Sequence, residues 1–460
     1  MTMRKVLLLA SLAAAAFPAT AQITFSENVA PIVYRRCTGC HRPGEAAPFS
    51  LITYEDLAKH GKLIALVTES RMMPPWRAEP ASYPYKDSRR LSNEELATIQ
   101  AWVKAGMPKG DPAKIPAPPK FPDGWQLGTP DLVVKMDKGF AVPAEGADIY
   151  RYQRIALNLP DDKWVQAIEL RPSARKVVHH VLYFAASSEE AKRIEAEQEA
   201  SGSSGASMRF TRSMVPLGGI AVGGQPHLLP GGLALKVPKG TDLMFQYHFH
   251  PIGKAETEQS TVGLYFAKQP PDHTLTNVQL PVSYGLFAGL DIAPGQKDFR
   301  VRDSFVLPVD VQAVSVGAHA HYIGKTMKMT ATFPDGTVKT LLDIKDWDFA
   351  WQDRYFFENT ILLPKGTKLE SEVSWDNSQE NPKNPSRPAI QVHWGEQTKD
   401  EMGAVTLTVY PAAESDLATL QQAYRDHVRD IARERIRQDP SLLTKIRELT
   451  GDPAPAKSNP

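Results

Sequence analysis

Cysteine is nearly absent from this chain, because its 460 residues contain only Cys37 and Cys40. The remaining sequence therefore cannot form a structural disulfide, and the folded core, together with any bound metal, must provide its stability. Excess basic charge is also absent, since 53 Lys and Arg oppose 52 Asp and Glu, which argues against a nucleic-acid-binding surface. Beyond the first 21 residues, no apolar run is long enough to cross a membrane.

The first 21 residues have the three parts of a secretory signal peptide. Arg4 and Lys5 precede an apolar run over 6–17, and small residues at 19–21 provide a cleavage site. An anchoring transmembrane helix is the alternative, but the apolar run is short and a cleavage site follows it. We therefore expect a periplasmic or secreted protein with no membrane span after cleavage.

The two cysteines belong to the motif Cys37-Thr-Gly-Cys40-His41. In an exported chain this spacing predicts a covalently attached haem c, with two thioether bonds and His41 as an axial ligand. A redox Cys-x-x-Cys is the alternative reading. It lacks the βαβ context usual for that motif and leaves His41 unexplained.

Methionine is the expected second axial ligand, and it would raise the iron potential. We favour Met73, because the prolines that follow it predict a rigid extended loop that can present its sulfur. Met72 and Met107 are the other candidates, and each of the three could instead be a core methionine.

The chain changes character along its length. Helical spacing at 25–36, 54–69 and 92–105 predicts an all-α cytochrome c domain, and the proline-dense stretch that follows predicts a semi-rigid linker. Short alternating segments then recur between Pro-Gly turns, which favours two consecutive β-sandwiches. We expect residues 187–230 to form a long loop between these strands, with one short helix at 189–200.

The C-terminal segment has a helical pattern from 415 to 449, broken at Asp439-Pro440, with a partial apolar stripe. We expect this helix to pack on its own domain, and an oligomer contact is the alternative. The expected organisation is a signal peptide (1–21), an all-α cytochrome c domain (22–111), a proline-rich linker (112–124), two tandem all-β jelly-roll-like sandwiches (125–273 and 274–412), and a C-terminal helix and tail (413–460).

Six of the twelve histidines occur in three short runs: 179–180, 248–250 and 319–321. Residues two apart in a strand point to one face, so His319 and His321 can chelate a metal together. His248 and His250 have the same spacing. Adjacent residues such as His179 and His180 can bind one metal together only where the strand twists or ends. The alternative is that both are polar side chains whose hydrogen bonds are satisfied without a metal. Imidazole combined with a methionine thioether favours copper.

The order of these motifs carries a resemblance to a known family. The chain has Val-Val-His-His-Val-Leu-Tyr-Phe (177–184), Met-Phe-Gln-Tyr-His-Phe-His-Pro (244–251), Gly-Ala-His-Ala-His-Tyr-Ile-Gly-Lys (317–325) and Asp-Glu-Met-Gly (400–403). Over about 130–411 it resembles the type II copper, ascorbate-dependent monooxygenases, the peptidylglycine α-hydroxylating and dopamine β-monooxygenase family. The resemblance implies two copper ions, an electron-donating one on His179, His180 and His248, and an oxygen-binding one on His319, His321 and Met402.

In that family the oxygen-binding copper activates O2 and the other copper supplies an electron, and ascorbate is the reductant in the animal enzymes. We therefore expect an oxidoreductase that hydroxylates a C–H bond of a small organic substrate with O2. Electrons would reach the His179/His180/His248 copper through the fused haem c, from ascorbate, a quinol-chain cytochrome or a similar donor. The alternatives are a non-catalytic electron-transfer or copper-carrying protein, and a copper-free partner of a multihaem-type dehydrogenase.

The chain also departs from the family. It has Gly317 where the peptide-amidating enzymes have arginine and Thr406 where they have tyrosine, and it lacks their disulfides, which argues against peptide amidation. His250 is an additional histidine, with a role beside the ligands or on the solvent face of the strand. Five aromatic residues could line a substrate pocket or belong to the sandwich core: Tyr322, Trp351, Tyr355, Trp375 and Trp394.

Overall fold

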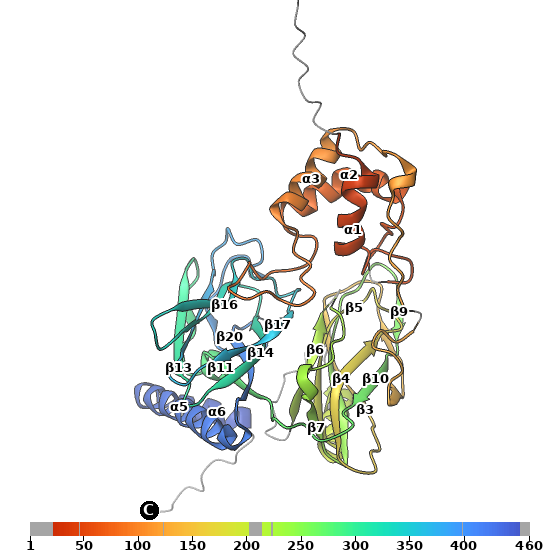
Figure 1. Cartoon of the computed structure of the whole chain (residues 1–460). Helices are drawn as coiled ribbons and strands as arrows, with labels where there is room; N and C mark the ends of the chain where they lie inside the picture. Colours follow the sequence, from red (N-terminus) through yellow and green to blue (C-terminus); the bar gives the residue numbers. More distant parts are fainter. Residues whose placement is uncertain are drawn as a thin grey trace, which may run out of the picture.

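The computed structural model describes residues 22–45, 47–122, 124–201, 214–221, 224–397 and 399–450. The expected signal peptide and the tail beyond residue 450 lie outside them. A helical unit lies at one end, two β-sandwiches lie side by side below it, and two C-terminal helices lie against the second sandwich (Figure 1). No helix in the described ranges is long and apolar enough to span a membrane.

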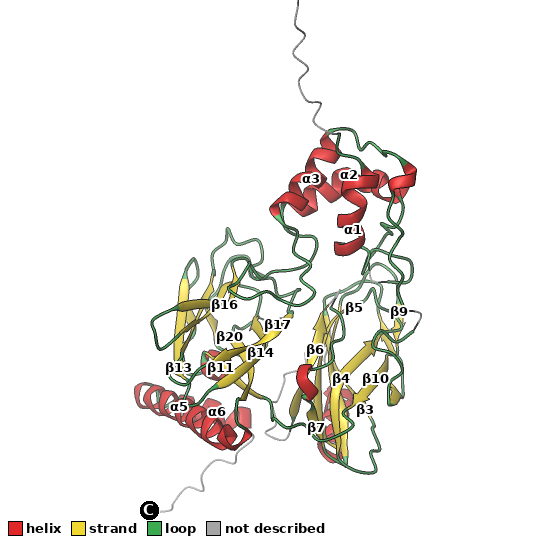
Figure 2. Cartoon of the chain, viewed as in Figure 1, coloured by secondary structure: helices red, strands yellow, loops and turns green. Residues whose placement is uncertain are grey.

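The N-terminal unit is built from short helices joined by long irregular segments (Figure 2). A π-helical turn leads into α1, and both α2 and α3 begin with a capping box, Thr53 with Asp56 and Ser92 with Glu95. The helix predicted at 54–69 is confirmed. Whether this unit is a cytochrome c domain stays a prediction. Its helices are η1 (Phe25–Val29), α1 (Ala30–Arg36), α2 (Tyr54–Glu69) and α3 (Asn93–Lys104).

The first sandwich consists of two four-stranded antiparallel sheets, β1-β10-β4-β7 and β3-β8-β5-β6. Both sheets contribute to one apolar core, which includes Val165 and Leu264 from one and Val181 and Phe245 from the other. Its elements are β1 (Leu132–Lys135), β2 (Phe140–Val142), β3 (Ile149–Ile155), β4 (Lys163–Arg171), β5 (Val178–Ser187), α4 (Ser188–Ser201), β6 (Val215–Ala221), β7 (Leu235–Val237), β8 (Thr241–Phe249), β9 (Glu256–Glu258) and β10 (Thr261–Phe266).

Strand β6 corrects the expectation of a loop over 187–230. The helix predicted inside that range is present as α4, but residues 215–221 pair with β5 as an edge strand. The sequence Val-Pro-Leu-Gly-Gly-Ile-Ala contains Pro and Gly, which are rare in strands and typical of edges, so composition alone indicates a loop. Pairing with the long strand β5 overrides that preference.

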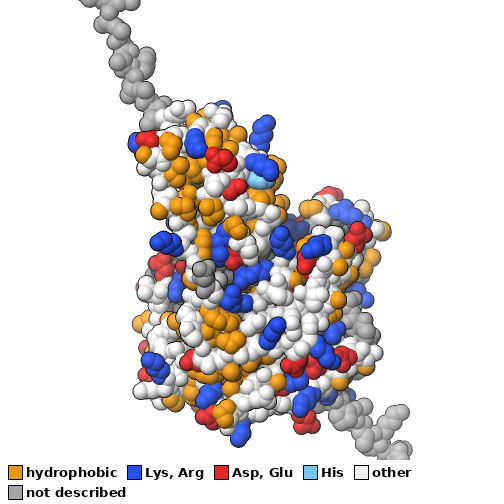
Figure 3. Space-filling model, turned by 90° about the vertical axis from the view of Figure 1, so that its right-hand side faces the viewer, with side chains coloured by type: hydrophobic (Ala, Val, Ile, Leu, Met, Phe, Trp, Pro, Cys, Tyr) orange, Lys and Arg blue, Asp and Glu red, His pale blue; other side chains and the backbone are white. Residues whose placement is uncertain are grey.

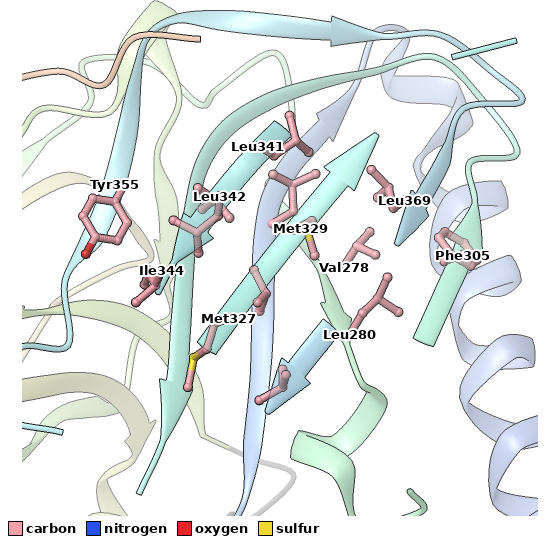
Figure 4. Close-up of a cluster of buried hydrophobic side chains, with 14 of the residues drawn as sticks. Val278, Leu280, Phe305, Met327, Met329, Leu341, Leu342, Ile344, Tyr355 and Leu369 are labelled. Carbon is pink, nitrogen blue, oxygen red and sulfur yellow. The ribbon is translucent and has the colours of Figure 1, made fainter. Parts of the chain in front are cut away.

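The second sandwich also has two four-stranded sheets, β11-β20-β14-β17 and β13-β18-β15-β16, around a core that includes Val278, Met327, Met329 and Leu342 (Figure 4). The expected β-sandwiches and C-terminal helix are therefore confirmed. The elements are β11 (Thr276–Leu280), β12 (Asp291–Ile292), β13 (Phe299–Val306), β14 (Val311–Ala320), β15 (Gly324–Thr332), β16 (Val338–Ile344), β17 (Arg354–Leu363), β18 (Lys368–Trp375), β19 (Val392–His393), β20 (Gly403–Pro411), α5 (Leu417–Gln438) and α6 (Leu442–Thr450).

Helix α5 packs on the second sandwich, as expected for a helix that belongs to its own domain. Leu420 is buried in the sandwich core, and the Tyr424 hydroxyl donates a hydrogen bond of 2.8 Å to the Gln279 carbonyl oxygen. On the surface, Lys and Arg side chains are interspersed with Asp and Glu on the face that Figure 3 presents, in keeping with the balanced charge.

A segment of the N-terminal unit crosses to the second sandwich, and we call residues 74–90 the strap. Its Trp76, Ala78 and Tyr85 are buried in the core of that sandwich. The Glu79 backbone N–H donates to the Asp343 carbonyl (2.8 Å), and Ala78 and Tyr85 form isolated β-bridges with the sandwich. The helical unit therefore packs into the core of the second sandwich, although the chain that follows it leads to the first.

Candidate metal centres

A β-bulge brings His179 and His180 together on one side of the first sandwich. In the pairing of β5 with β8, Val178 lies opposite Phe249 and His180 lies opposite His248, so His179 is an extra residue on its strand. A bulge of this kind breaks the alternation of side chains and re-aims one of them. The strand irregularity that two adjacent histidines need in order to share a metal is therefore present at this position.

The three imidazoles form a compact cluster, in which one nitrogen from each of His179, His180 and His248 lies within 4.8 Å of the others. The Nδ1 atoms of His180 and His248 are 3.3 Å apart. His179 Nδ1 is buried and has no hydrogen-bond partner among the described residues. A buried nitrogen without a partner is costly, and a metal ion at the centre of the cluster would satisfy it.

Asp148 fixes the orientation of the cluster. Its two carboxylate oxygens lie 2.7 Å from His248 Nε2 and 2.7 Å from His250 Nδ1. Burial alone would raise the pKa of Asp148, but the hydrogen bonds from the two histidines lower it to about 2. Because His248 Nε2–H donates to a carboxylate, the lone pair of a neutral imidazole is on Nδ1, which faces His180. His250 itself is 60% exposed and holds Asp148 from the solvent side.

Burial disfavours the charged forms of His179 and His180, and metal ligation requires neutral imidazoles. Desolvation, followed by the effect of His248, lowers the pKa of His179 to about 4. The same two causes hold the pKa of His180 well below its ordinary value. The convergent nitrogens of the three imidazoles fit a metal ion such as copper, whose preferred ligands include imidazole.

The second histidine pair lies at the end of β14 in the second sandwich. His319 is paired with Ala404 of β20 and Ala320 with Gly403, so Met402 follows directly beyond the last pair, at the strand end where His321 lies. His321 and Met402 are buried, and the His319 and His321 ring centroids are 5.3 Å apart. The structure thus brings the three predicted residues to one end of the β14–β20 pair.

Hydrogen bonds at Nδ1 orient both rings of this pair. The backbone carbonyl of Asp400 can only accept, so His321 Nδ1–H donates to it over 2.9 Å. Gln352 Oε1 lies 2.6 Å from His319 Nδ1, and its amide nitrogen donates to the Phe349 carbonyl. In both neutral imidazoles the lone pair is therefore on Nε2. Two Nε2 atoms with a nearby thioether fit a soft copper ion.

Glu401 holds the backbone around this pair. Its carboxylate accepts hydrogen bonds from the backbone N–H groups of His321 (3.0 Å) and Ile323 (2.8 Å), and from Trp375 Nε1 (2.9 Å). Burial raises the pKa of Glu401 to about 8 in spite of these donors. Because Glu401 adjoins Met402 in the chain, these hydrogen bonds hold the residues that follow β14 next to Met402.

Phe349 lies between the two sandwiches and contacts both groups of histidines. Its ring centroid is 6.3 Å from that of His180, 6.1 Å from His248 and 5.7 Å from His321. The loop 346–353 that carries it also supplies Gln352 and places Trp351 5.7 Å from His179. One loop of the second sandwich therefore lies against both candidate metal sites.

The five aromatic residues proposed for a pocket divide into two groups. Tyr355, Trp375 and Trp394 are buried and belong to the core of the second sandwich. Trp351 contacts His179, and the Tyr322 ring lies 4.9 Å from that of Phe349, so these two lie at the interface between the sandwiches.

The Cys37–His41 motif follows α1 and faces the first sandwich. His41 Nδ1 lies 3.1 Å from the Phe49 carbonyl, which can only accept, so Nε2 carries the lone pair and could bind haem iron. Cys40 lines one cavity together with His179 and His180, and Arg175 bridges to Glu45 (2.5 Å) at its edge. Residues that fit a haem and a copper thus border the same space.

The methionine ligand of the haem stays a prediction. Met73 is partly buried just after α2, where its backbone N–H donates to the Val67 carbonyl (2.9 Å), whereas Met72 is 52% exposed. Met107 packs against the helical core, close to Gly61 of α2.

Sequence reasoning missed Asp148, Gln352, Phe349 and Glu401. Asp148 is 100 residues before His248 in the chain, and Gln352 is 33 residues after His319. Of these, only Glu401 adjoins a predicted ligand, but nothing in a single sequence distinguishes it from a solvent-exposed glutamate.

Comparison with known proteins does not identify the chain. No protein-family model matches it, and no curated protein matches it. The major capsid protein P2 from bacteriophage PM2 is 11% identical with a TM-score of 0.26, covering 61% of this chain and 96% of that one. A structure of PNGF-II is 8% identical with a TM-score of 0.25, covering 61% and 65%. Similarities this weak do not indicate a function.

Proposed function

We propose that this protein is a relative of the type II copper monooxygenases that hydroxylates a C–H bond of a small organic substrate. The reaction joins one oxygen atom of O2 to carbon and reduces the other to water, which consumes two electrons and two protons. When bound, two copper ions and one haem c would supply O2 activation and electron transfer. The presence of a signal-like leader in the sequence supports a periplasmic or secreted location.

One observation carries the proposal: two sets of imidazoles that present different ring nitrogens lie on either side of Phe349. The first set presents Nδ1 atoms and has three histidines. The second presents Nε2 atoms from two histidines and has Met402 beside them. The three-histidine set favours a copper that only exchanges electrons, and the set with two histidines and a thioether leaves a position open for O2.

The protein's own side chains would hold these sites in place and shield them. Asp148 and Gln352 fix the ring orientations, and Glu401 fixes the backbone beside Met402. Phe349 is only 6% exposed, and its apolar ring lies between the two histidine groups. The cavity lined by Cys40, His179 and His180 supports delivery of electrons from the haem to the first site.

The first test is the metal content of protein matured where haem c is attached. We expect two copper ions per iron in the wild type and one in His319→Ala, and no change in the matched control His393→Ala, a 64% exposed histidine whose ring pairs with Asp291. Iron without copper would contradict the proposal.

A second measurement separates the enzyme from the copper-carrying alternative. Reduced haem in the copper-loaded protein should be reoxidised by O2 in a stopped-flow experiment, and His180→Ala should slow this reaction. Two copper ions with no effect of O2 on the haem would favour the electron-transfer or copper-carrying role instead.

A further inference from the structure

A cavity of about 320 Å³ lies between the two sandwiches and is lined by both. The first sandwich contributes β4 and β6, and the second contributes the sheet β11-β20-β14-β17. Among the described residues that line it, none is Asp or Glu, and Arg354 is the one with a permanent charge. Its volume falls at the lower end of the range for small-molecule sites.

Arg354 lies in register between this cavity and His319. On β14 the residues Ser315, Gly317 and His319 lie on one face of the sheet, because they are two residues apart. Ser315 lines the cavity, and Arg354 of β17 is paired with Gly317. Arg354 is thus displaced from His319 by two residues along the strand direction, which is about 7 Å.

The guanidinium group of Arg354 has no acidic partner. No described carboxylate forms an ion pair with it, and its neighbour Asp353 pairs with Arg89 instead. Its Nη1 atom lies 3.7 Å from the position that a Cβ atom would take on Gly218, so the side chain reaches across to β6 of the first sandwich. It remains accessible to solvent through the cavity.

Gly317, the residue paired with Arg354, has open space where a side chain would start. A Cβ atom there would meet only the Asp353 carbonyl oxygen at 3.7 Å and Arg354 Cα at 4.0 Å, which are ordinary contacts. Crowding therefore does not require glycine at this position. On the other side, the Tyr284 ring lies edge-on to His319 with centroids 5.5 Å apart, and Tyr284 is close enough to Arg354 to interact electrostatically.

We propose that Arg354 binds the carboxylate group of a small organic substrate that occupies this cavity. An arginine without an acidic partner in a cleft between two domains can donate two parallel hydrogen bonds to a carboxylate. The register then directs the remainder of the molecule along the β14 face toward His319. The assignment of the substrate class rests on the proposed function, whereas the binding of a carboxylate does not.

The test is calorimetric titration of the full-length haem protein with phenylacetate, 4-phenylbutyrate and octanoate, and with the matching neutral amides. We expect at least one carboxylate to bind about tenfold or more tightly than its amide. Arg354→Gln should abolish this preference, and Arg354→Lys should restore only part of it. The control Arg302→Gln alters an exposed arginine on β13 that pairs with Glu372, and should bind as the wild type does.

Two results would overturn the proposal: no carboxylate preferred over its amide, or a preference that survives in Arg354→Gln. Far-UV circular dichroism and copper content of Arg354→Gln should match the wild type, which separates lost binding from lost folding. In His319→Ala the carboxylate preference should persist without a second copper. Retained binding in a protein that takes up no copper would refute the proposed function and leave the carboxylate site standing.

Discussion

The two histidine sites bring pairs of imidazoles to one side of a strand through different backbone geometry. In the first sandwich, adjacent His179 and His180 reach one side because a bulge interrupts β5. In the second, His319 and His321 reach one side through the ordinary alternation of a strand. Asp148, a carboxylate, orients the first site, whereas the amide of Gln352 and a backbone carbonyl orient the second. Under the proposed function, this difference predicts that the two metal ions are held through different imidazole nitrogens, with a negative group beside the first site and neutral groups beside the second.

The largest expected effect comes from removing one ligand at a time. His180→Ala should lose the metal of the first site and His319→Ala that of the second, because each group of ligands lies in its own sandwich. Isothermal titration of metal-free protein with Cu(I) should show one remaining site in each variant, with affinity changed less than tenfold. Loss of both sites in either variant would show that the two sites do not bind metal independently, and would contradict the assignment of one site to each sandwich.

The next effect concerns Glu401, which has no counterpart at the first site. Glu401→Ala leaves three buried donors unsatisfied and should lower the free energy of unfolding by about 3 kcal/mol or more. Urea denaturation of the metal-free protein measures this, with the exposed residue Glu358→Ala as control. A change under about 0.5 kcal/mol, the range typical of surface substitutions, would remove the proposed anchoring role.

A smaller effect should distinguish the orienting groups. Asp148→Asn should weaken metal binding at the first site about 10- to 100-fold, as for other groups that orient metal-bound histidines. Gln352→Leu should weaken the second site by less, because a neutral amide is a weaker acceptor than a carboxylate. Competition with a chelator gives both affinities, and equal losses would contradict the assigned difference in charge.

Phe349 should give the smallest effect. Phe349→Leu keeps an apolar side chain between the sites and should cost about 1 kcal/mol of stability, with both metals still bound. Urea denaturation and metal analysis together measure it. A parallel fall in the copper affinity of both sites would show that this ring couples them, and the two sites would no longer be independent.

Local patterns in the sequence predicted much of the fold, and long-range packing accounts for the rest. Helix α2 has the predicted bounds because a capping residue and apolar periodicity are both encoded locally. Strand β6 was missed because its stability comes from pairing with β5. The family resemblance implied that the histidine runs divide into two clusters, but Asp148 and Phe349 reach the sites through tertiary packing, which one sequence does not show.

The strap attaches the N-terminal unit to the second sandwich by packing, in addition to the covalent linker over 112–124. Trp76 and Tyr85 are buried in the second sandwich, and Arg175 pairs with Glu45 on the first. A protease that cut the chain within 112–124 would therefore sever the covalent link but leave the apolar and ionic contacts in place. The nicked protein should migrate as a single species until denaturant is added, so limited proteolysis would yield a two-fragment complex rather than a free N-terminal unit.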